Sequence, residues 1–571
     1  MATNRYFSCS SFATIALSLA FSSTTATCLA QSVDAGALSR NAESAARPPE
    51  EAPPAATPVA PRAKTGPVVQ VRRFVVEGAT LVPTARLEAL LAKRAGALHF
   101  SDLELAAQIV SREYARRGFF ARATVPPQDV TDGVVRIEVI EGVMGQTTVL
   151  PGAPANIDAD YVRKIATARL KEGAPYSAAD LERGLLLADD LAGVSIRGVL
   201  KSGEGRGRSD LDLTITDEPF FSGVVGVNNQ GSIATGVGQA FATASLANFS
   251  GRGDRLQLIG QNSARLVYGK AVYRAPIGAD GLSADLGLST LRYRLGHDFA
   301  ALESEGQAGV VEAGLTYPLV RASRGDLSVR LSASRQRYAD DVLDTPLRRK
   351  RLVGGALEVW GERTDQLAGG GHTSFQLRLA GGRLDLSDQP DDAEQDALTA
   401  RAAGDYGKLV FEISRAQRLA RSLYLRGRLF GQATTGNLDT AEQASLGGPT
   451  NVRAYPVIEG AGDEAAVANL ELHRPVGGPW ASRIDLYGFV DGGWVRQHRK
   501  PWDGWNASGQ SNAYTLAGAG LGATWNAPGG LNLSLVAAAP LGPNPGQTAP
   551  GVNQDGSRRA ARAWLSLSRT F

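Results

Sequence analysis

The sequence contains few of the residues that build cross-links, metal sites and active sites. Cysteine occurs only at positions 9 and 28, inside an N-terminal targeting segment, so the mature chain is expected to hold no disulfide and no thiolate metal site. The five histidines are scattered, whereas a metal site would need them clustered. There is no G-x-S-x-G, no H-E-x-x-H and no phosphate-binding loop. We therefore expect no enzymatic activity, no metal and no cofactor.

Long hydrophobic runs and an excess of one charge are also missing. The formal net charge of +3 gives no reason to expect nucleic-acid binding, which would need a concentrated basic face. Beyond residue 30 no apolar run reaches about 18 residues, so no membrane-spanning helix is expected. Without such a helix, a chain can cross a membrane only as a closed β-barrel, which pairs its backbone groups. The chain does have 66 glycines and 43% hydrophobic residues, which favours a β-rich protein of several domains.

The first residues have the pattern of an export signal. Arg5 precedes an apolar run at 12–21, and small residues precede Gln31, so residues 1–30 are predicted to be a secretory signal peptide. The alternative is a lipoprotein anchored at Cys28, but Thr25 stands where leucine is expected. Residues 31–66 are predicted to be an N-terminal segment and a Pro/Ala-rich linker. Within them, residues 34–47 form either a short helix or a disordered tail.

One supersecondary pattern then occurs twice, at 67–142 and at 143–217. The first copy is predicted to have a strand at 69–77, helices at 84–93 and 102–117, and strands near 123–125 and 134–141. The second has a helix near 160–170 and strands near 194–200 and 211–216. Ser101 and Ser177 are predicted to cap the second helix of each copy.

This β-α-α-β-β unit, set before a barrel, resembles the POTRA domain. The stretch VPPQDVTDGVVRIEVIEG at 125–142 carries the resemblance most strongly. The alternative is a generic small α/β domain. A POTRA unit implies that an unfolded client adds itself as a strand at a sheet edge.

Residues 218–571 alternate between apolar and polar positions in about sixteen segments, an even number as expected for a bacterial membrane β-barrel. The joins at 250–253, 276–280 and 527–530 are short and predicted to be periplasmic. The joins at 385–402, 435–463, 497–511 and 540–557 are long and predicted to lie outside. The polar face carries Arg255, Arg330, Arg378, Arg426 and Arg428, which line either a wet lumen or the solvated face of a soluble sandwich.

Two stretches of this region contain a candidate site. LGGPTNVRAYP at 446–456 is a polar loop with Arg453, and SRIDLYGFVDGGW at 482–494 alternates so that Arg483, Asp485, Tyr487, Phe489 and Asp491 share one face. An ion pair between Arg453 and Asp491 would hold the loop inside the barrel. Spacing alone favours a simpler interpretation, a solvated loop arginine and an unrelated lumen charge.

The motifs VRAYP and FVDGG resemble the VRGY/F and F-x-D-x-G motifs of two-partner secretion transporters, the TpsB (ShlB/FhaC/HecB-like) branch of the outer-membrane POTRA/β-barrel insertase superfamily. The resemblance implies a fold that combines α+β and all-β parts, with two periplasmic POTRA domains followed by a barrel of approximately 16 strands. It also implies a loop motif and a barrel-wall motif as functional sites: Gly447, Gly448, Val452, Arg453, Ala454 and Tyr455, and Phe489, Asp491 and Gly493. Ala454 stands where the family usually has glycine, which leaves the backbone at the loop tip open.

The C-terminal sequence WLSLSRTF is also informative. Leu565, Leu567 and Phe571 resemble the signal by which outer-membrane barrels are recognised for assembly, and this strand is expected to close the barrel against the first. Gly518, Gly520 and Gly522 superficially suggest a nucleotide loop. They lie in an alternating strand with no following helix, so we interpret them as barrel glycines.

The resemblance implies an outer-membrane transporter of a Gram-negative bacterium. It would capture an unfolded cognate exoprotein, such as an adhesin or haemolysin, and export it through the barrel. Its further partners would be outer-membrane lipids and the barrel-assembly machinery. The alternatives are a barrel-assembly insertase, a passive porin, and an enzyme fused to a barrel; the porin would not need the periplasmic repeats, and no catalytic motif supports the enzyme.

Overall fold

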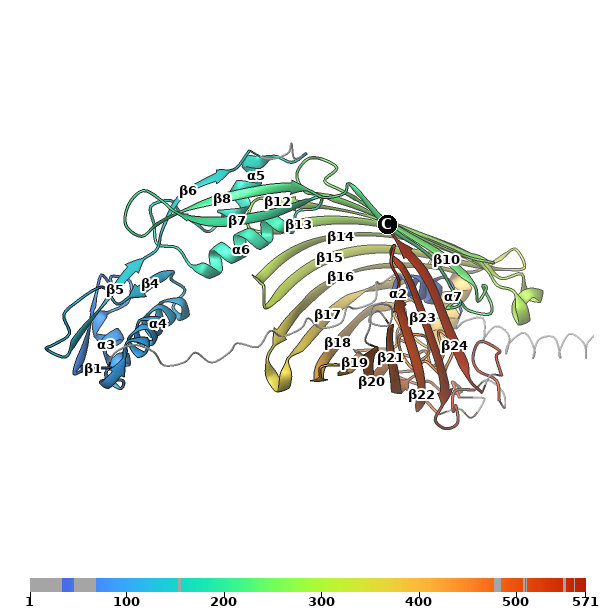
Figure 1. Ribbon diagram of the computed structural model, residues 1–571. Coiled ribbons are helices and arrows are strands. Elements are labelled where there is room, and N and C mark those ends of the chain that lie inside the picture. The colour runs from blue at the N-terminus through green and yellow to red at the C-terminus, as the bar shows by residue number, and fades with distance from the viewer. Residues whose placement is uncertain are drawn as a thin grey trace, which may run out of the picture.

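The structure is a computed structural model that describes residues 33–45, 68–151, 156–476, 484–506, 509, 511–547, 551–558 and 560–571. The predicted signal peptide at 1–30 lies outside the described residues, as does the 31–66 segment apart from 33–45. Two α/β units follow one another and lead into a large barrel (Figure 1).

The first unit folds as a small sheet covered by two helices. Strands β2, β5 and β4 form one sheet in that order, and β1 pairs with β3 in another. Leu87, Tyr114, Val135 and Ile137 are fully buried between the helices and the sheet. The elements are β1 Val68–Val71, β2 Arg73–Glu77, α3 Thr84–Ala92, β3 Gly96–His99, α4 Phe100–Arg116, β4 Ala121–Thr124 and β5 Val134–Glu141.

The second unit has the same order of helices and sheet strands. It contains β6 Val143–Val149, α5 Ala159–Ala166, α6 Ala178–Asp189, β7 Val194–Ser202 and β8 Arg208–Asp217, with the sheet order β6-β8-β7. Ser177 caps α6 as predicted, because its hydroxyl accepts from the amides of Ala179 and Asp180. The prediction for Ser101 was wrong. The N-cap of α4 is His99, whose amide donates to the Asp102 carboxylate, so the helix begins one residue before Ser101.

Sixteen antiparallel strands form the closed barrel, and β24 pairs with β9 to complete it. This confirms the fold class and the strand count expected from the alternation. The strands are β9 Phe221–Asn228, β10 Gln239–Ala247, β11 Arg255–Ser263, β12 Leu266–Ile277, β13 Leu282–Arg294, β14 Glu305–Ala322, β15 Gly325–Val342, β16 Thr345–Asp365, β17 Gly371–Asp385, β18 Gly404–Ala420, β19 Leu423–Thr434, β20 Glu464–Val476, β21 Ile484–Arg496, β22 Ala513–Asn526, β23 Leu531–Pro540 and β24 Arg562–Thr570; the connections carry η1 His297–Leu302, η2 Leu367–Gly369 and α7 Pro390–Leu398.

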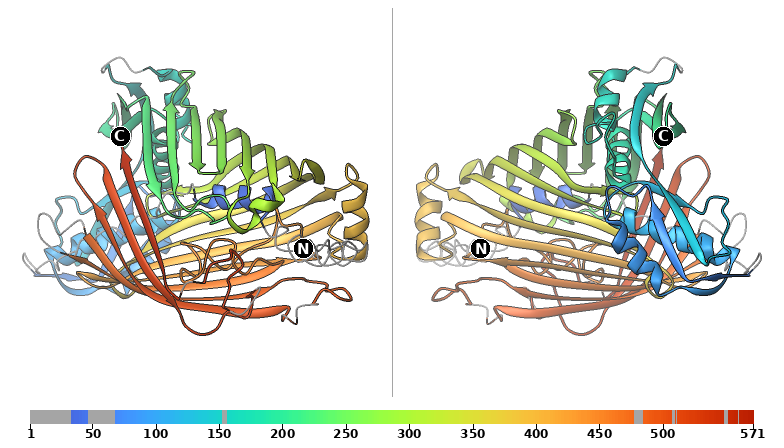
Figure 2. Two further views of the ribbon diagram at one scale, coloured as in Figure 1. Left: turned by 90° about the vertical axis from the view of Figure 1, so that its right-hand side faces the viewer. Right: turned by 90° about the vertical axis from the view of Figure 1, so that its left-hand side faces the viewer.

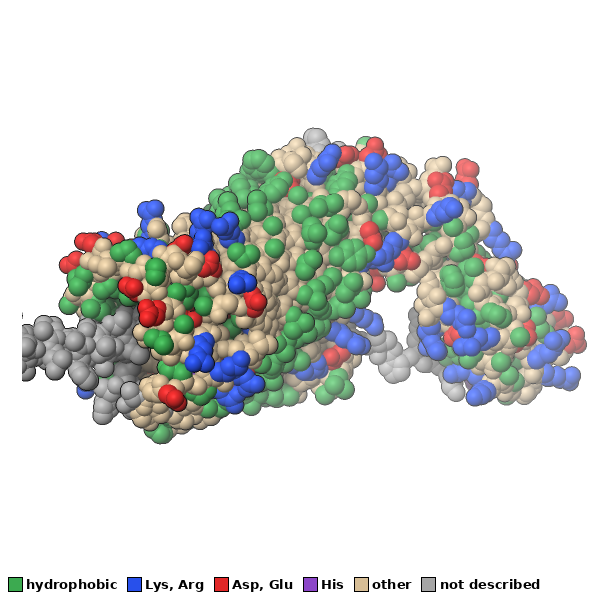
Figure 3. Space-filling view, turned by 180° about the vertical axis from the view of Figure 1, so that it is seen from behind, with side chains coloured by type: hydrophobic (Ala, Val, Ile, Leu, Met, Phe, Trp, Pro, Cys, Tyr) green, Lys and Arg blue, Asp and Glu red, His purple; other side chains and the backbone are tan. Residues whose placement is uncertain are grey.

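The barrel wall is apolar outside and polar inside. Leu486 and Val490 of β21 are about half exposed on the outer face, whereas Asp491 is fully buried. On the face of the molecule shown in Figure 3, hydrophobic side chains gather in a band around the barrel, with basic side chains on both sides of it. This is the distribution expected of a wall that meets lipid.

The second α/β unit is seated on one end of the barrel. Arg183 of α6 donates to the carbonyls of Asp280 and Pro318 at 3.2 and 2.7 Å, and Arg169 pairs with Asp280 at 2.9 Å. Arg321 pairs with Asp190 from the next turn. The short joins therefore lie at the end that carries the α/β units, and the long joins lie at the opposite end.

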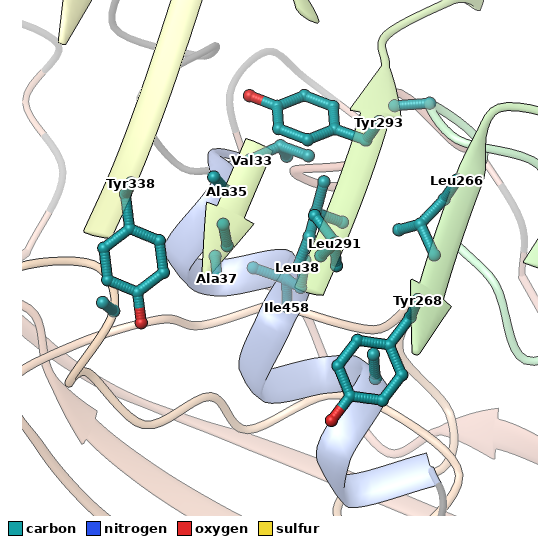
Figure 4. Close-up of a cluster of buried hydrophobic side chains, with 14 of the residues drawn as sticks. Val33, Ala35, Ala37, Leu38, Leu266, Tyr268, Leu291, Tyr293, Tyr338 and Ile458 are labelled. Carbon is teal, nitrogen blue, oxygen red and sulfur yellow. The ribbon is translucent and has the colours of Figure 1, made fainter. Parts of the chain in front are cut away.

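Helix α2, Ala35–Ala45, lies inside the barrel. Figure 2 shows it surrounded by the strands, and Figure 4 shows Leu38 against Leu291 of the wall. Its small apolar residues are buried in one cluster with Tyr268, Tyr293 and Tyr338. Of the two interpretations of the predicted segment 34–47, the structure has the helix at Ala35–Ala45, and residues 46 and 47 lie outside the described residues.

Candidate functional site

Arg453 is anchored to the barrel wall by the partner that the sequence suggested. Its Nε and Nη2 atoms donate to the two oxygens of Asp491 at 3.0 and 2.7 Å, and its backbone amide donates to the same carboxylate at 3.0 Å. A third guanidinium nitrogen, Nη1, lies 2.5 Å from Glu471 of β20. Asp491 is 0% exposed and Arg453 is 5% exposed. Charge-assisted, bidentate bonds of this kind are the strongest polar contacts in proteins, so this loop anchor (Arg453, Asp491 and Glu471) fixes the loop in the lumen.

Neighbouring side chains complete the loop anchor. Asn469, directly opposite Asp491 on β20, donates to its carboxylate at 2.8 Å and to the carbonyl of Asn451 in the loop. The guanidinium carbon of Arg453 lies 3.5 Å from the centre of the Phe489 ring, in cation–π geometry. Trp564 of the last strand donates from Nε1 to the carbonyl of Arg453 at 2.8 Å. The loop tip is thus held by side chains from β20, β21 and β24.

The polar chain continues along the wall beyond Glu471. His473 contacts Glu471 at 2.9 Å and Asp485 at 2.8 Å, and its ring is stacked between Tyr424 and Tyr487. Asp485 and Tyr487 lie on the lumen face of β21, as predicted. Arg483, predicted on the same face, lies outside the described residues.

The other loop-motif residues shape the loop itself. Gly447 donates its amide to the carbonyl of Glu459, and a Cβ at this position would lie 2.7 Å from the Glu459 Cβ. Gly448 has a φ of +117°, which a residue with a Cβ rarely adopts. Val452 and Tyr455 are buried against the wall, in a cluster with Leu446. The loop is therefore both folded on itself and packed onto the barrel.

Glycines on the wall make room for the loop. A Cβ at Gly493 would lie 3.0 Å from Leu446 and Val452, which explains the glycine in the wall motif. Ala454, the departure from the family pattern, does not have a positive φ, so glycine is not needed for its backbone. Its methyl group faces Gly518 of β22, where an added Cβ would lie only 2.7 Å away.

The other two glycines of that strand serve the same purpose. Gly520 lies beneath the Phe489 ring and Gly522 beneath the Tyr487 ring. All three are in β22, which agrees with their interpretation as barrel glycines.

The predicted C-terminal signal lies on the outer face of β24. Leu565 and Leu567 are exposed, and Phe571 packs its ring 5.7 Å from Phe221 of β9. The structure does not bring these residues to the loop anchor. The side chain of Trp564 points into the lumen instead and does reach the loop anchor.

Sequence reasoning missed four contributors: Glu471, Asn469, Trp564 and Gly518. Glu471 and Asn469 could have been found from their place on the polar face of the strand immediately before the one that carries the wall motif. Trp564 is an aromatic residue on the lumen side of a strand whose outer side carries leucines. Nothing in the sequence alone pairs it with the loop.

A second set of contacts holds α2. The Asp34 carboxylate lies 2.6 Å from Lys350 and 3.7 Å from Arg348, both on β16, and it accepts the amide of Ala37 at the helix start. Thr440 of the 435–463 loop also donates to it. Burial raises the pKa of Asp34, but Lys350 and Arg348 lower it more, so the net pKa lies below its usual range. We call Asp34 with these two cations the helix latch.

The 435–463 loop also contacts the last long loop. Glu459 is fully buried and accepts from the Asn544 amide at 2.5 Å and from the Gln554 backbone amide at 2.8 Å. Burial raises the pKa of Glu459 to about 7. Its charge state therefore changes near neutral pH.

No group of three or more histidine, cysteine, aspartate or glutamate side chains among the described residues could hold a metal ion. In the same part of the chain, no helix is long and apolar enough to cross a membrane.

Together, the sixteen-stranded barrel, the preceding α/β units and the loop anchored in the lumen define the class: an outer-membrane β-barrel transporter with POTRA domains. The family model for the haemolysin secretion/activation protein ShlB/FhaC/HecB matches residues 207–525, and the ShlB-type POTRA domain matches residues 69–142. The chain belongs to this family. It is a two-partner secretion transporter of the outer membrane, and its family exports cognate exoproteins and is not enzymatic.

Relatives and solved structures agree. The chain is 25% identical over 480 residues to the heme/hemopexin transporter protein HuxB of Haemophilus influenzae (strain 86-028NP), covering 82% of this chain and 81% of that protein. It is 25% identical over 451 residues to the outer membrane transporter CdiB of Escherichia coli O6:K15:H31 (strain 536 / UPEC), covering 76% and 74%. The structure of CdiB from Escherichia coli matches with a TM-score of 0.67 at 21% identity over 90% of this chain and 93% of that one. CdiB from Acinetobacter baumannii matches with a TM-score of 0.63 at 15% identity over 96% and 99%, which supports the fold.

Proposed function

We propose that this transporter exports one large exoprotein, an adhesin or a haemolysin, and that the loop anchor holds the 446–456 loop in the conformation that export requires. The observation that carries the second part is the threefold bonding of Arg453 to a carboxylate that is 0% exposed. A buried carboxylate without its cation would be strongly unfavourable, so separating the loop from the wall would cost much free energy.

The α/β units are proposed to capture the client as it emerges in the periplasm. In the first unit β4 is an edge strand of its sheet and lies beside α4, so an extended client segment can pair with it. Main-chain pairing suits a client that arrives unfolded, because it depends little on side chains. The related HuxB and CdiB are both named as transporters, which is consistent with export rather than barrel assembly.

The domain limits that we propose are the ones predicted from the sequence. We assign residues 1–30 to a signal peptide, 31–66 to the N-terminal segment and linker, 67–142 and 143–217 to the POTRA units, and 218–571 to the barrel. Outer-membrane lipids would surround the wall. The barrel-assembly machinery would recognise Leu565, Leu567 and Phe571, whose two leucines are exposed on the outer face.

A secretion assay tests the proposal. The gene is deleted in its own bacterium, the proteins released into the medium are compared, and the strain is complemented with wild type and with Arg453→Ala. We expect loss of a single large exoprotein, its return with wild type, and poor return with Arg453→Ala at normal levels of folded barrel. A general depletion of outer-membrane proteins would instead indicate an insertase, and an unchanged medium would refute export under those conditions.

A further inference from the structure

The outer face of the barrel carries an arginine patch at the end away from the POTRA units. It occupies β13, β15 and β16 and consists of Arg292, Arg294, Arg335, Arg337, Arg349 and Arg351. These positions alternate with lumen-facing ones such as Tyr293, Tyr338 and Lys350, which are buried. The patch therefore faces the membrane side of the wall and not the export channel.

The patch borders directly on the lipid-facing band. Along the same outer face, Leu288 is 51% exposed, Leu331 is 61% exposed and Val353 is 55% exposed. In each strand the nearest arginine of the patch lies only two or four residues from one of these apolar residues. The arginines thus stand where the hydrocarbon of the outer leaflet gives way to its head groups.

The strand register brings like charges together. Arg337 lies directly opposite Arg351 on β16, and Arg349 lies opposite Ala339, two residues from Arg337. Like charges directly across a strand pair are destabilising unless something negative lies between them. Arg351 is partly neutralised by Asp385 and Asp388 at 2.9 and 3.0 Å.

Only half of the patch has a carboxylate partner. Arg294 pairs with Glu305, Arg349 with Asp341, and Arg351 with the two aspartates. The other three, Arg292, Arg335 and Arg337, are exposed and have no hydrogen-bond or ion-pair partner in the described part of the chain. The patch therefore presents uncompensated positive charge at the membrane surface.

A hollow of about 550 Å³ opens in the middle of the patch. Arg337, Arg349 and Arg351 line it together with the polar side chains Thr290, Gln307 and Asp388. Gly309 also lines it, and a Cβ at that position would meet nothing within 4 Å, so the hollow is open above it. Guanidinium groups suit phosphate oxygens, and the hydroxyl, amide and carboxylate groups suit sugar hydroxyls.

We propose that this hollow binds a phosphorylated glycolipid of the outer leaflet, with the phosphate on Arg337 and its neighbours and the acyl chains along the apolar band. The combination of cations, sugar-binding polar groups and adjoining apolar surface matches all three parts of such a lipid. A free phosphate would use the cations alone, and an ordinary phospholipid would leave the sugar-binding groups unused.

The test uses the full-length protein, purified in detergent, and diphosphorylated lipid A as the probe, with binding measured by native mass spectrometry. The variant is Arg292→Gln/Arg335→Gln/Arg337→Gln. Each cation near an anionic lipid surface contributes roughly fivefold to affinity, so the triple variant should bind about a hundredfold more weakly. Lipid A stripped of its phosphates should bind wild type as weakly as the variant binds the intact lipid.

The matched control removes three exposed arginines at the other end of the same wall, Arg324→Gln/Arg363→Gln/Arg421→Gln. It should bind lipid A like wild type, and heat-modifiable migration on gels should show that both triple variants are folded. Equal affinity of wild type and the patch variant, or equal loss in the control, would overturn the proposal. If millimolar inorganic phosphate competes with lipid A, the hollow binds a free anion and the proposal is wrong. If phosphatidylglycerol binds as tightly as lipid A, the sugar plays no part in recognition and the proposal of a glycolipid is wrong.

Discussion

The barrel lumen holds two segments of the chain by opposite arrangements of charge. In the loop anchor an arginine from the loop meets carboxylates of the wall, whereas in the helix latch an aspartate from α2 meets cations of the wall. What remains after each segment leaves is also different. Without α2, Lys350 still has Asp439 at 2.9 Å and Arg348 still has Asp392 at 3.5 Å.

Removal of the loop would leave the carboxylates of the wall with fewer charged partners. Asp491 has no cationic partner besides Arg453 among the described residues, and it would keep only the amide of Asn469. Glu471 would keep His473. A buried unpaired carboxylate is costly, whereas a cation that passes from one carboxylate to another is not. Loss of α2 would therefore leave Lys350 and Arg348 paired, whereas loss of the loop would leave Asp491 without a cation among the described residues.

The largest effect should come from Asp491→Ala. It removes three of the bonds to Arg453 and leaves Glu471 as the one ion-pair partner of the buried guanidinium among the described residues, a loss of about 3–5 kcal/mol of loop docking. Export of the client should fall severely while the amount of folded barrel changes little. Glu312→Gln, which alters a lumen carboxylate whose partner Arg330 also pairs with Asp285, should export normally. Equal losses of export and of folded barrel in Asp491→Ala would contradict a role in transport.

Asp34→Asn tests how firmly the helix latch holds α2. Asparagine can still cap α2, but it loses the ion pairs with Lys350 and Arg348, which should weaken docking of the helix by about 1–3 kcal/mol. Conductance of the purified protein in planar bilayers should therefore rise about tenfold, at undiminished export. Glu43→Gln, which removes a more exposed pair with Lys270, serves as the control. Wild-type conductance in Asp34→Asn would show that the latch does not hold the helix.

Gly518→Ala should have a smaller effect on the loop anchor. The new methyl group would lie 2.7 Å from that of Ala454, and such overpacking costs about 1–3 kcal/mol. Protease cleavage in the 446–456 loop should increase, and Ala454→Gly in the same chain should restore protection. If the double variant is no better than Gly518→Ala, the two positions are not matched in the way the structure indicates.

Glu459→Gln should give the smallest effect, and one that depends on pH. Because the folded-state pKa is raised to about 7, the docked loop binds the proton more tightly than the unfolded chain does. Docking is therefore strongest below about pH 4.3 and weakens as the pH rises towards 7. Hydrogen exchange of residues 541–547, corrected for intrinsic rates, should rise severalfold between pH 5 and 8 in wild type and stay level in the variant. A wild-type slope that survives in Glu459→Gln would assign the pH dependence to another group.

Alternation along the chain is a local property, and it predicted the repeated units and the even strand count. Spacing alone did not predict the pair of Arg453 and Asp491, which depended on the resemblance of their two motifs to those of a known family. The sequence did not predict Glu471, Trp564 or Gly518 as parts of the site, since their roles depend on which strands meet at the loop tip. The start of α4 shows that even a local feature can be predicted wrongly, since Ser101 is not its cap. The cap of α4 moved to His99 because the Asp102 carboxylate can bond its amide, and the sequence allowed either start.

The indole of Trp564 ties the loop to the seam of the barrel. The residue belongs to β24, which closes the wall by pairing with β9. Its bond to the carbonyl of Arg453 can form only when β24 is in place. A wall without this strand would therefore lack one of the contacts that hold the loop tip.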